Sequence, residues 1–385
     1  MLENHRLERI DTIPSRDKFP RYVGRNAFGN PQKYGGGNKI RLLTTDQGAQ
    51  GWAAAAASEE ELTPLIGQRI SDLIDPDIGV LEHALGIDQP LHDLAGRILD
   101  KPVYQLLGAN GPTNVPIYSG SIYFDDLEPE DAPKGISNII ASCRQDYETG
   151  YRAFKLKIGR GFKWMPKEEG QQRDIDAVHA VRENFPDCKI LVDANDTYSP
   201  DDFITFLNGV ADCDLYWIEE PFPEDEADLK KLKDHMAKIS CNALIAEGEA
   251  RAKGAKPRNP DDPPWRYGYY TPEHIENLYD LHAKGLVDAL VIDLNVVGFT
   301  RWRHIMPDLI KANIPVGPHT WCWCVRPHYV AQLGAGLGNV LCIEGIPGTC
   351  SGLDFANYKI VNGEMVVPDL PGFAMPLLEG ESDVV

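Results

Sequence analysis

Eight short runs of β-branched and aliphatic residues, separated by helix-sized amphipathic segments, dominate the chain from residue 115 onwards. This alternation predicts parallel strands joined by crossover helices. Eight such units in roughly 230 residues match the size of a closed (β/α)8 or TIM barrel. An open doubly wound sheet is the alternative, but no run is followed by a G-x-G-x-x-G or Walker loop, so the barrel is favoured. The runs are VPIYSGSIYF, AFKLKI, KILVD, LYWIE, ALIAE, ALVID, IPVG and VLCIE.

The region before residue 115 has a different character and predicts a smaller α+β unit. Two strand-like stretches flank a turn at Asp46 to Gly48, and the apolar residues take helical spacing from about Ile78 to Leu107. Before the first of these strand-like stretches, the segment from Arg21 to Asn38 is rich in Gly, Asn and Pro, which predicts a long loop. Its arginines and tyrosines would suit an oxygen-rich ligand, so it is either a surface connection or a lid.

Composition narrows the classes of partner. The chain has 58 acidic and 38 basic residues among 385, a net charge of −20, which argues against nucleic-acid and membrane-surface roles. No apolar run reaches the eighteen or so residues of a membrane helix, and the first residues lack a secretory signal. Eight cysteines are too sparse for a disulfide scaffold. We therefore expect a reduced, cytoplasmic protein.

Nearly every predicted strand ends in an ionisable residue, at a spacing of about 31 residues per unit. In a barrel of this kind, the carboxyl ends of the strands meet in one mouth, where the active site lies. Seven consecutive occurrences favour a shared site over solvated strand ends. The residues are Lys155 and Lys157, Asp193 with Asn195, Glu219 and Glu220, Glu247 and Glu249, Asp293, His319, and Glu344.

Three carboxylates from adjacent strands, Asp193, Glu219 and Glu249, suit a hard divalent cation such as Mg²⁺. The absence of His and Cys from this set disfavours zinc. Glu247 shares a strand face with Glu249, so the sequence leaves open which of the two binds the metal.

Two groups on opposite sides of the expected metal can move protons. Lys155 and Lys157 leave the same strand face, and one ammonium beside another is expected to depress the pKa of at least one lysine. Across the mouth, Asp293 can orient His319 and make it more basic. Together with a metal, these groups suit removal of a proton beside a carboxylate, with the enediolate stabilised by the cation and by a protonated Glu344.

The motifs resemble those of the enolase superfamily, and within it the mandelate racemase subgroup, over nearly the whole chain. In the barrel these are FKLKIG, VDAN, WIEEP, AEGE, VIDLN, IPVGPH and CIEG, and before it TTDQGAQGW and ALGIDQPLHDLAGRILDKPVYQLLG. The resemblance implies an α+β N-terminal capping domain over residues 1–114 with a lid loop at about 18–38. It also implies a barrel over 115–350 and a C-terminal segment, 351–385, that returns to complete the capping domain.

The resemblance also implies roles for single residues. Asp193, Glu219 and Glu249 would bind one Mg²⁺ per subunit. Lys157 would be one base with Lys155 as its electrostatic neighbour, and the Asp293–His319 dyad would be the second base or acid, while Glu344 would hydrogen-bond the substrate carboxylate. Expected substrate contacts are Asn195, Glu220, Arg21 and Tyr22.

Three features depart from the family pattern. LNVVGFT after Asp293 replaces an expected Gly-Gly pair, Glu247 stands where a small or neutral residue is usual, and a Pro-rich insertion spans Arg251 to Tyr270. The insertion is either a surface or oligomer-contact loop or part of the substrate mouth.

The function expected from the family is Mg²⁺-dependent dehydration of a sugar acid to a 2-keto-3-deoxy acid, a hydro-lyase reaction. The same two bases also suit a racemase or epimerase, or a lactone cycloisomerase; a catalytically silent sugar-acid binding protein is the remaining alternative. The expected partner is a small anionic carboxylate substrate, with no nucleic acid and no membrane, and the family tends toward homo-oligomers.

Overall fold

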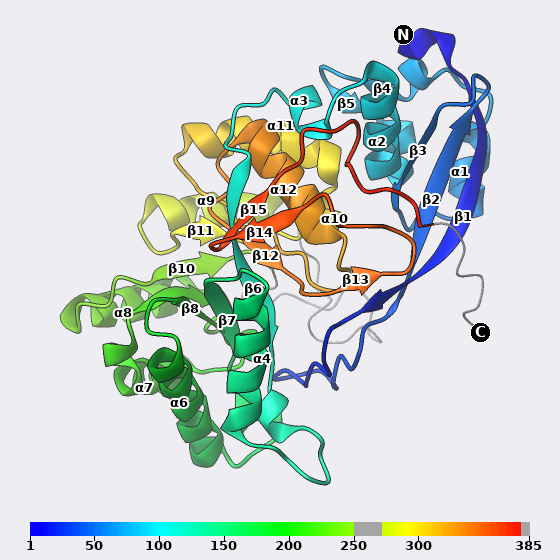
Figure 1. Cartoon of the computed structure of the whole chain (residues 1–385). Coiled ribbons are helices and arrows are strands. Elements are labelled where there is room, and N and C mark those ends of the chain that lie inside the picture. The colour runs from blue at the N-terminus through cyan, green and yellow to red at the C-terminus, as the bar shows by residue number, and fades with distance from the viewer. Residues whose placement is uncertain (250–271, 379–385) are drawn as a thin grey trace.

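The computed structural model describes residues 1–249 and 272–378. They form a (β/α)8 barrel with an α+β capping unit beside it (Figure 1). The insertion predicted at Arg251 to Tyr270 lies outside the described residues.

Parallel strands form the barrel in the order in which they occur in the chain. The order runs from β6 to β11, and β12 pairs back with β6 to close the ring. The seventh predicted strand, IPVG, forms only isolated bridges from Val316 to Leu290 and Val340. Pro315 and Pro318 flank these bridges and lack the N–H groups that a continuous ladder needs. The strands are β6 (Asn114–Ile122), β7 (Ala153–Lys157), β8 (Lys189–Asp193), β9 (Leu215–Glu219), β10 (Leu244–Glu247), β11 (Ala289–Leu290) and β12 (Ile343–Gly345).

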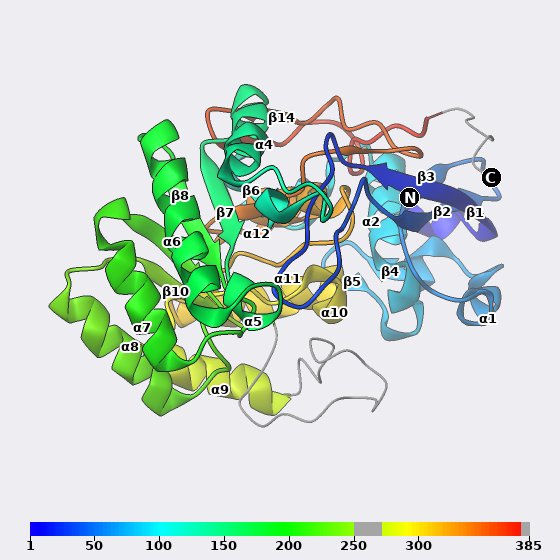
Figure 2. The ribbon, with the colours of Figure 1, turned by 90° about the horizontal axis from the view of Figure 1, so that it is seen from below.

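Helices surround this ring (Figures 1 and 2). Alternation along β7 decides which side chains meet them: Phe154 and Leu156 join the same buried cluster as Val178 and Val181 of α6, which leaves Lys155 and Lys157 facing inward. No helix among the described residues is long and apolar enough to cross a membrane. The helices are α4 (Ile136–Glu148), α5 (Arg160–Lys163), α6 (Lys167–Asn184), α7 (Pro200–Gly209), α8 (Glu226–Lys238), α9 (Pro272–Ala283), α10 (Leu294–Val297), α11 (Phe299–Lys311) and α12 (Arg326–Leu337).

The capping unit is built on an antiparallel sheet in the order β13-β1-β2-β3. Helix α2 packs on β3, and a Cβ at Gly51 would overlap the backbone of Leu94, so this close approach requires glycine. Its strands are β1 (Leu7–Lys18), β2 (Gly37–Thr45), β3 (Gln50–Ala54), β4 (Ile74–Asp75), β5 (Gly79–Val80) and β13 (Thr349–Cys350), and its helices are α1 (Glu59–Leu62), α2 (Asp88–Leu99) and α3 (Val103–Leu106). Short 3-10 helices occur in both parts of the molecule. Before the barrel these are η1 (Leu2–Asn4), η2 (Thr63–Leu65), η3 (Ile70–Asp72) and η4 (Glu82–Ile87), and within the barrel they are η5 (Asp125–Leu127) and η6 (Ala211–Cys213).

The C-terminal segment contacts both parts of the molecule. Its hairpin of β14 (Lys359–Val361) and β15 (Glu364–Val366) pairs with the start of β6. The chain then runs back to the capping unit, where Trp52 Nε1 donates to Met375 O at 2.7 Å and Phe373 N donates to Asp93 Oδ1 at 2.6 Å. In Figure 1 this red segment lies beside α2 and β3.

The loop between β1 and β2 reaches from the capping sheet to the barrel (Figure 2). Hydrogen bonds and an ion pair hold it there. Gly24 N donates to Asp125 Oδ1 at 2.8 Å, and Arg25 pairs with Glu128 at 2.6 Å. Further along, Trp164 Nε1 donates to the carbonyl of Asn26 at 2.7 Å. These contacts fix the loop beside the segments that follow β6 and β7.

Candidate active site

The strand ends bring eight predicted side chains into one network of contacts. β7 supplies two lysines, β8 and β9 each end on a carboxylate, and the residues after β10 and β11, the seventh barrel segment and β12 supply the rest. Their ion pairs link every member to at least one other. The eight are Lys155, Lys157, Asp193, Glu219, Glu249, Asp293, His319 and Glu344.

Three of the carboxylates form a candidate metal centre. One oxygen each of Asp193, Glu219 and Glu249 lies within 4.8 Å of the others. Glu247 is not part of this group, which favours Glu249 as the third ligand between the two that the sequence leaves open. The donors are all carboxylate oxygens, as Mg²⁺ prefers, and Glu249 Oε2 is buried with no hydrogen-bond partner among the described residues. This set fits a hard divalent cation.

The two lysines are bound to these carboxylates, and this corrects the expected lysine pKa. Lys155 contacts Glu219 and lies 3.3 Å from Asp193, while Lys157 contacts Asp193. Burial lowers the pKa of Lys157, and so does Lys155, as the sequence predicts. However, the carboxylates, Asp193 foremost, outweigh both effects and raise the pKa of Lys157 above its usual value. The pKa of Lys155 is also raised, so the expected depression is wrong for this arrangement.

His319 lies across the cluster from Lys157 and forms the predicted dyad. Its Nδ1 is 2.9 Å from Asp293 Oδ2, and its Nε2 is 3.2 Å from Glu249 Oε1. Burial lowers the pKa of His319, but Glu249, Glu344 and Asp293 together raise it to about 9. At neutral pH the imidazole is therefore protonated and can act as an acid.

Glu344 is ionised, which corrects the expectation of a protonated donor. Burial raises its pKa, but Lys155 at 2.8 Å and His319 lower it to about 2. Its Oε2 also accepts the backbone N–H of Thr320 at 2.8 Å and of Trp321 at 3.1 Å. These backbone donors follow His319 directly, and sequence reasoning missed them because they carry no residue signature. Glu344 therefore fixes the position of Lys155 and of the backbone after His319.

The charges of the network do not balance. Three cationic side chains meet five carboxylates, so a formal deficit of two positive charges remains when all are ionised. Glu219 shows the consequence: burial, with Asp193 and Glu344 nearby, raises its pKa to about 8 despite the contact with Lys155. One divalent cation would supply the missing charge.

A second group of buried acids surrounds the cluster and was only partly predicted. Glu220 and Glu247 are at most 2% exposed, and each has an Oε1 without a hydrogen-bond partner among the described residues. Burial raises the pKa of both, with neighbouring carboxylates adding to the effect. Glu224, which the sequence did not single out, pairs with His274 at 3.0 Å. An acid three residues after the WIEEP motif was the available signal.

The strand ends turn sharply beside these acids. Asn195 and Glu220 have φ angles of 45° and 44°, in the left-handed region that residues other than glycine rarely adopt. Asn195 donates its backbone N–H to Asp193 Oδ1 at 2.9 Å, and its side chain lies 3.4 Å from Glu220 Oε2. Backbone strain of this kind concentrates at functional sites.

The loop residues differ in how they relate to the mouth. Asn26 Nδ2 lies 3.3 Å from Asn195 Oδ1, so the loop does reach the site. Arg21 bonds Asp146 at 2.5 Å and Ser121 Oγ at 2.7 Å through its two terminal nitrogens, and its role as a substrate contact stays a prediction. Tyr22 packs edge-on against Tyr34, and its role as a substrate contact stays a prediction.

Fold and site together define a capped (β/α)8 barrel whose mouth holds a carboxylate triad, a candidate metal site, between a lysine and a histidine. Comparison with known proteins agrees with this class. The family profile described as "Enolase C-terminal domain-like" matches residues 138–253. The solved structure of a galacturonate dehydratase from Geobacillus sp., complexed with D-galacturonate and 5-keto-4-deoxy-D-galacturonate, is 30% identical. It covers 97% of this chain and 95% of its own, with a TM-score of 0.83.

Two curated relatives match shorter stretches. D-xylonate dehydratase from Haloferax volcanii is 26% identical over 77% of this chain and 68% of its own length. A 3,6-anhydro-α-L-galactonate cycloisomerase from Streptomyces coelicolor is 33% identical over 59% of this chain, and the match spans about half of that relative, 52%. The chain belongs to the enolase superfamily, in its mandelate racemase subgroup, and its relatives include both dehydratases and isomerases.

Proposed function

We propose that this protein dehydrates a sugar acid, by removing the proton alpha to the carboxylate and expelling the hydroxyl at the beta carbon. The observation that carries the proposal is the placement of Lys157 and His319 at different edges of one carboxylate cluster, the first on Asp193 and the second on Glu249. A base in one of these places can take the α-proton, and an acid in the other can protonate the β-hydroxyl as it leaves.

The carboxylate triad would hold Mg²⁺, and magnesium is present in a solved structure of the galacturonate dehydratase from Geobacillus sp.. When bound, this ion supplies positive charge that favours the enediolate and competes with Lys157 for Asp193. Lys155, fixed by Glu344 at 2.8 Å, presents a second positive charge beside the substrate carboxylate.

The proton steps then follow from the side chains. Lys157, as the free amine, takes the α-proton, and the electron pair moves into the enediolate. His319, protonated and held by Asp293, gives its proton to the leaving β-hydroxyl, which departs as water. The remaining enol becomes a 2-keto-3-deoxy acid. The same relation of keto and deoxy carbons to the carboxylate is found in 5-keto-4-deoxy-D-galacturonate, the compound in the relative's structure.

A panel of aldonic, uronic and aldaric acids, D-galacturonate included, tests the proposal. The protein with Mg²⁺ should convert at least one member to an α-keto acid and release one water for each. Absence of turnover with every member would refute the dehydratase assignment.

Racemisation, epimerisation or lactone cycloisomerisation is the second candidate, because two opposed proton-transfer groups serve these reactions as well. The curated cycloisomerase relative supports keeping it. Reaction in deuterium oxide separates the two: inversion with deuterium at the α-carbon and no loss of water favours a racemase or epimerase. A silent binding protein would show no exchange at all, and Lys157→Ala would leave its ligand affinity intact.

A further inference from the structure

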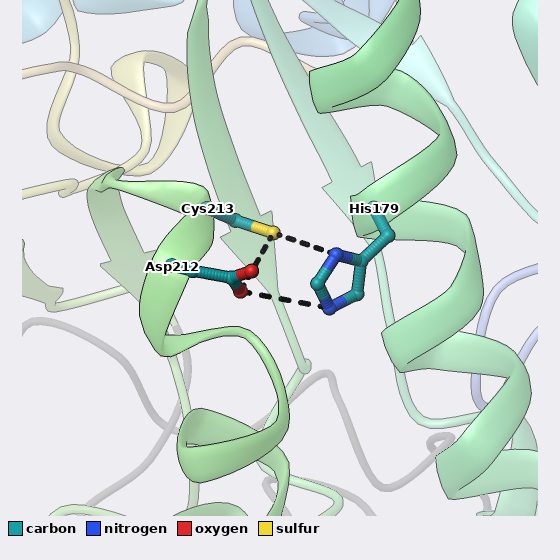
Figure 3. A group of neighbouring side chains, drawn as sticks. All are labelled: His179, Asp212 and Cys213. Carbon is teal, nitrogen blue, oxygen red and sulfur yellow. Dashed lines mark hydrogen bonds and ion pairs between the residues drawn. The ribbon is translucent and has the colours of Figure 1, made fainter.

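Three metal-ligating side chains converge at the end of the barrel opposite the mouth (Figure 3). His179 comes from α6, and Asp212 and Cys213 come from η6, just before the start of β9. Glu219 of the mouth lies at the other end of this strand, so the two groups are separated by its whole length. Nothing in the proposed dehydration uses these residues.

Their spacing fits the edges of a tetrahedral metal site. Cys213 Sγ lies 3.4 Å from His179 Nδ1 and 3.8 Å from Asp212 Oδ1. With bonds of about 2.3 Å to sulfur and about 2.1 Å to nitrogen and oxygen, these separations correspond to angles at the metal of roughly 100° and 120°. Both values lie close to the tetrahedral angle, and one ligand atom from each of the three residues lies within 4.8 Å of the others.

The imidazole is held in the tautomer that such a site needs. His179 Nε2 lies 2.8 Å from the carbonyl of Gly209, which can only accept a hydrogen bond, so Nε2 carries the proton. The lone pair of Nδ1 then faces Cys213 Sγ. A metal-binding histidine ordinarily donates its other N–H to a carbonyl or carboxylate in this way.

The other two proposed ligands differ in how exposed they are to solvent. Cys213 is 1% exposed and therefore fixed by its surroundings, whereas the side chain of Asp212 is 80% exposed. An ion can enter from the solvent on the Asp212 side, and water can complete the fourth position there. Burial raises the pKa of the Cys213 thiol to about 11, so it is protonated in the free protein and its proton passes to solvent as the metal–sulfur bond forms.

The donor types select the ion. Sulfur and nitrogen ligands suit borderline-soft cations such as zinc, while the all-carboxylate set in the mouth suits magnesium. We propose that His179, Asp212 and Cys213 form a second metal site that binds Zn²⁺ and ties α6 to η6. This proposal stands independently of the reaction catalysed at the mouth.

Cobalt(II) absorption tests the site in the full-length protein. The protein is first stripped with EDTA and then saturated with Mg²⁺, so that the mouth is filled before Co²⁺ is titrated in. We expect about one equivalent of Co²⁺ to give a sulfur-to-cobalt charge-transfer band, because thiolate coordination produces it and carboxylate coordination does not. Added Zn²⁺ should displace the cobalt and abolish the band.

Variants assign the band to these residues. Cys213→Ser and His179→Ala should lose it, and Cys322→Ser, which removes an exposed thiol elsewhere, should keep it. Asp212→Asn changes an exposed side chain and so should fold normally, but it should weaken Co²⁺ binding roughly tenfold or more. A wild-type protein without the band, or a band that survives in Cys213→Ser, would show that the group is only a thiol–imidazole hydrogen bond and would overturn the proposal.

Discussion

Two buried clusters of charge lie near the carboxyl end of β7, and they differ in how completely their atoms are satisfied. In the first, Arg160 is 1% exposed and bonds Asp126 and Asp174, each at 2.6 Å. The second oxygen of Asp174 accepts from Gly159 N at 2.8 Å and from the hydroxyl of Tyr198 at 2.7 Å. Every polar atom of the Arg160 guanidinium has a partner.

The mouth leaves carboxylate oxygens without partners. Glu249 of the network, and Glu220 and Glu247 of the group around it, each have one such buried oxygen among the described residues. Its carboxylates also spread in pKa, since Asp193 is lowered by the two lysines against the effect of burial while Glu219 is raised to about 8. A cluster that only stabilises the fold satisfies its groups, whereas one built to receive an ion and a substrate leaves groups available.

Removing Lys157 should produce the largest effect and should act on the reaction. Lys157→Ala takes away the proposed base, and we expect kcat to fall roughly 10²–10⁴-fold, as for other general bases. Steady-state kinetics on the substrate found in the acid panel measures this, with circular dichroism to verify the fold. Lys230→Ala, which removes an exposed lysine paired with Asp234, is the matched control and should leave kcat unchanged. Equal losses in both variants would contradict the assignment.

Removing Arg160 should act on the fold instead. Arg160→Met leaves buried Asp174 without a cation and buried Asp126 with only Arg173 at 3.3 Å, so we expect the free energy of unfolding to fall by about 3–5 kcal/mol. Urea denaturation checks this, with Arg9→Met as control because the pair of Arg9 with Asp11 is exposed. If Arg160→Met cost no more than Arg9→Met, the contrast between the two clusters would fail.

The two clusters also mark how far the sequence predicts this structure. The alternation of strands and helices predicts the barrel, and the residues at strand ends predict the eight members of the mouth network, because strand direction alone brings them together. Charge state was not predictable in the same way. Glu344 was expected to be protonated and is ionised, since burial raises its pKa but Lys155 and His319, which only the folded chain places beside it, lower it by more.

Arg21 and Arg160 also show that the sequence did not predict which side chains pair with each other. The sequence suggests Arg21 as a substrate contact because it lies in a polar loop, and in the structure two of its nitrogens bond Asp146 of α4. Arg160 follows FKLKIG directly and drew no attention, although it is among the largest fully buried side chains. Ion pairs between elements far apart in the chain determine the surroundings of both arginines, and no local sequence pattern predicts such pairs.

The unbalanced charge in the mouth should appear as a pH-dependent stability of the metal-free protein. Glu219 has a folded pKa of about 8 against an ordinary value of 4.5, so the folded state keeps a proton that the unfolded state has lost between these limits. The free energy of unfolding should therefore decrease as pH rises through this window, by about 1.4 kcal/mol per pH unit from this group. Denaturation in EDTA at several pH values measures the slope.

Mg²⁺ and Glu219→Gln should each flatten that slope, for different reasons. Mg²⁺ binds the ionised carboxylates of the folded state and stabilises it more at higher pH. Glu219→Gln removes the titrating group, and Glu226→Gln, at an exposed ion pair with Lys284, should leave the slope as it is. A metal-free protein whose stability rises over this range would contradict the charge deficit.

The smallest effect concerns the orientation of His319. Because His319 must be protonated to serve the leaving hydroxyl, kcat of the Mg²⁺-loaded protein should fall as pH rises past the pKa of this imidazole, which Asp293 helps to raise. Asp293→Asn keeps the shape of the dyad but removes a negative charge 2.9 Å from Nδ1, so the basic limb of the pH profile should move down by roughly one unit. Asp234→Asn, at an exposed pair, should not move it. A uniform loss of kcat with an unmoved limb would mean that Asp293 positions the ring without tuning its charge, whereas a shifted limb would tie the acid step to this dyad.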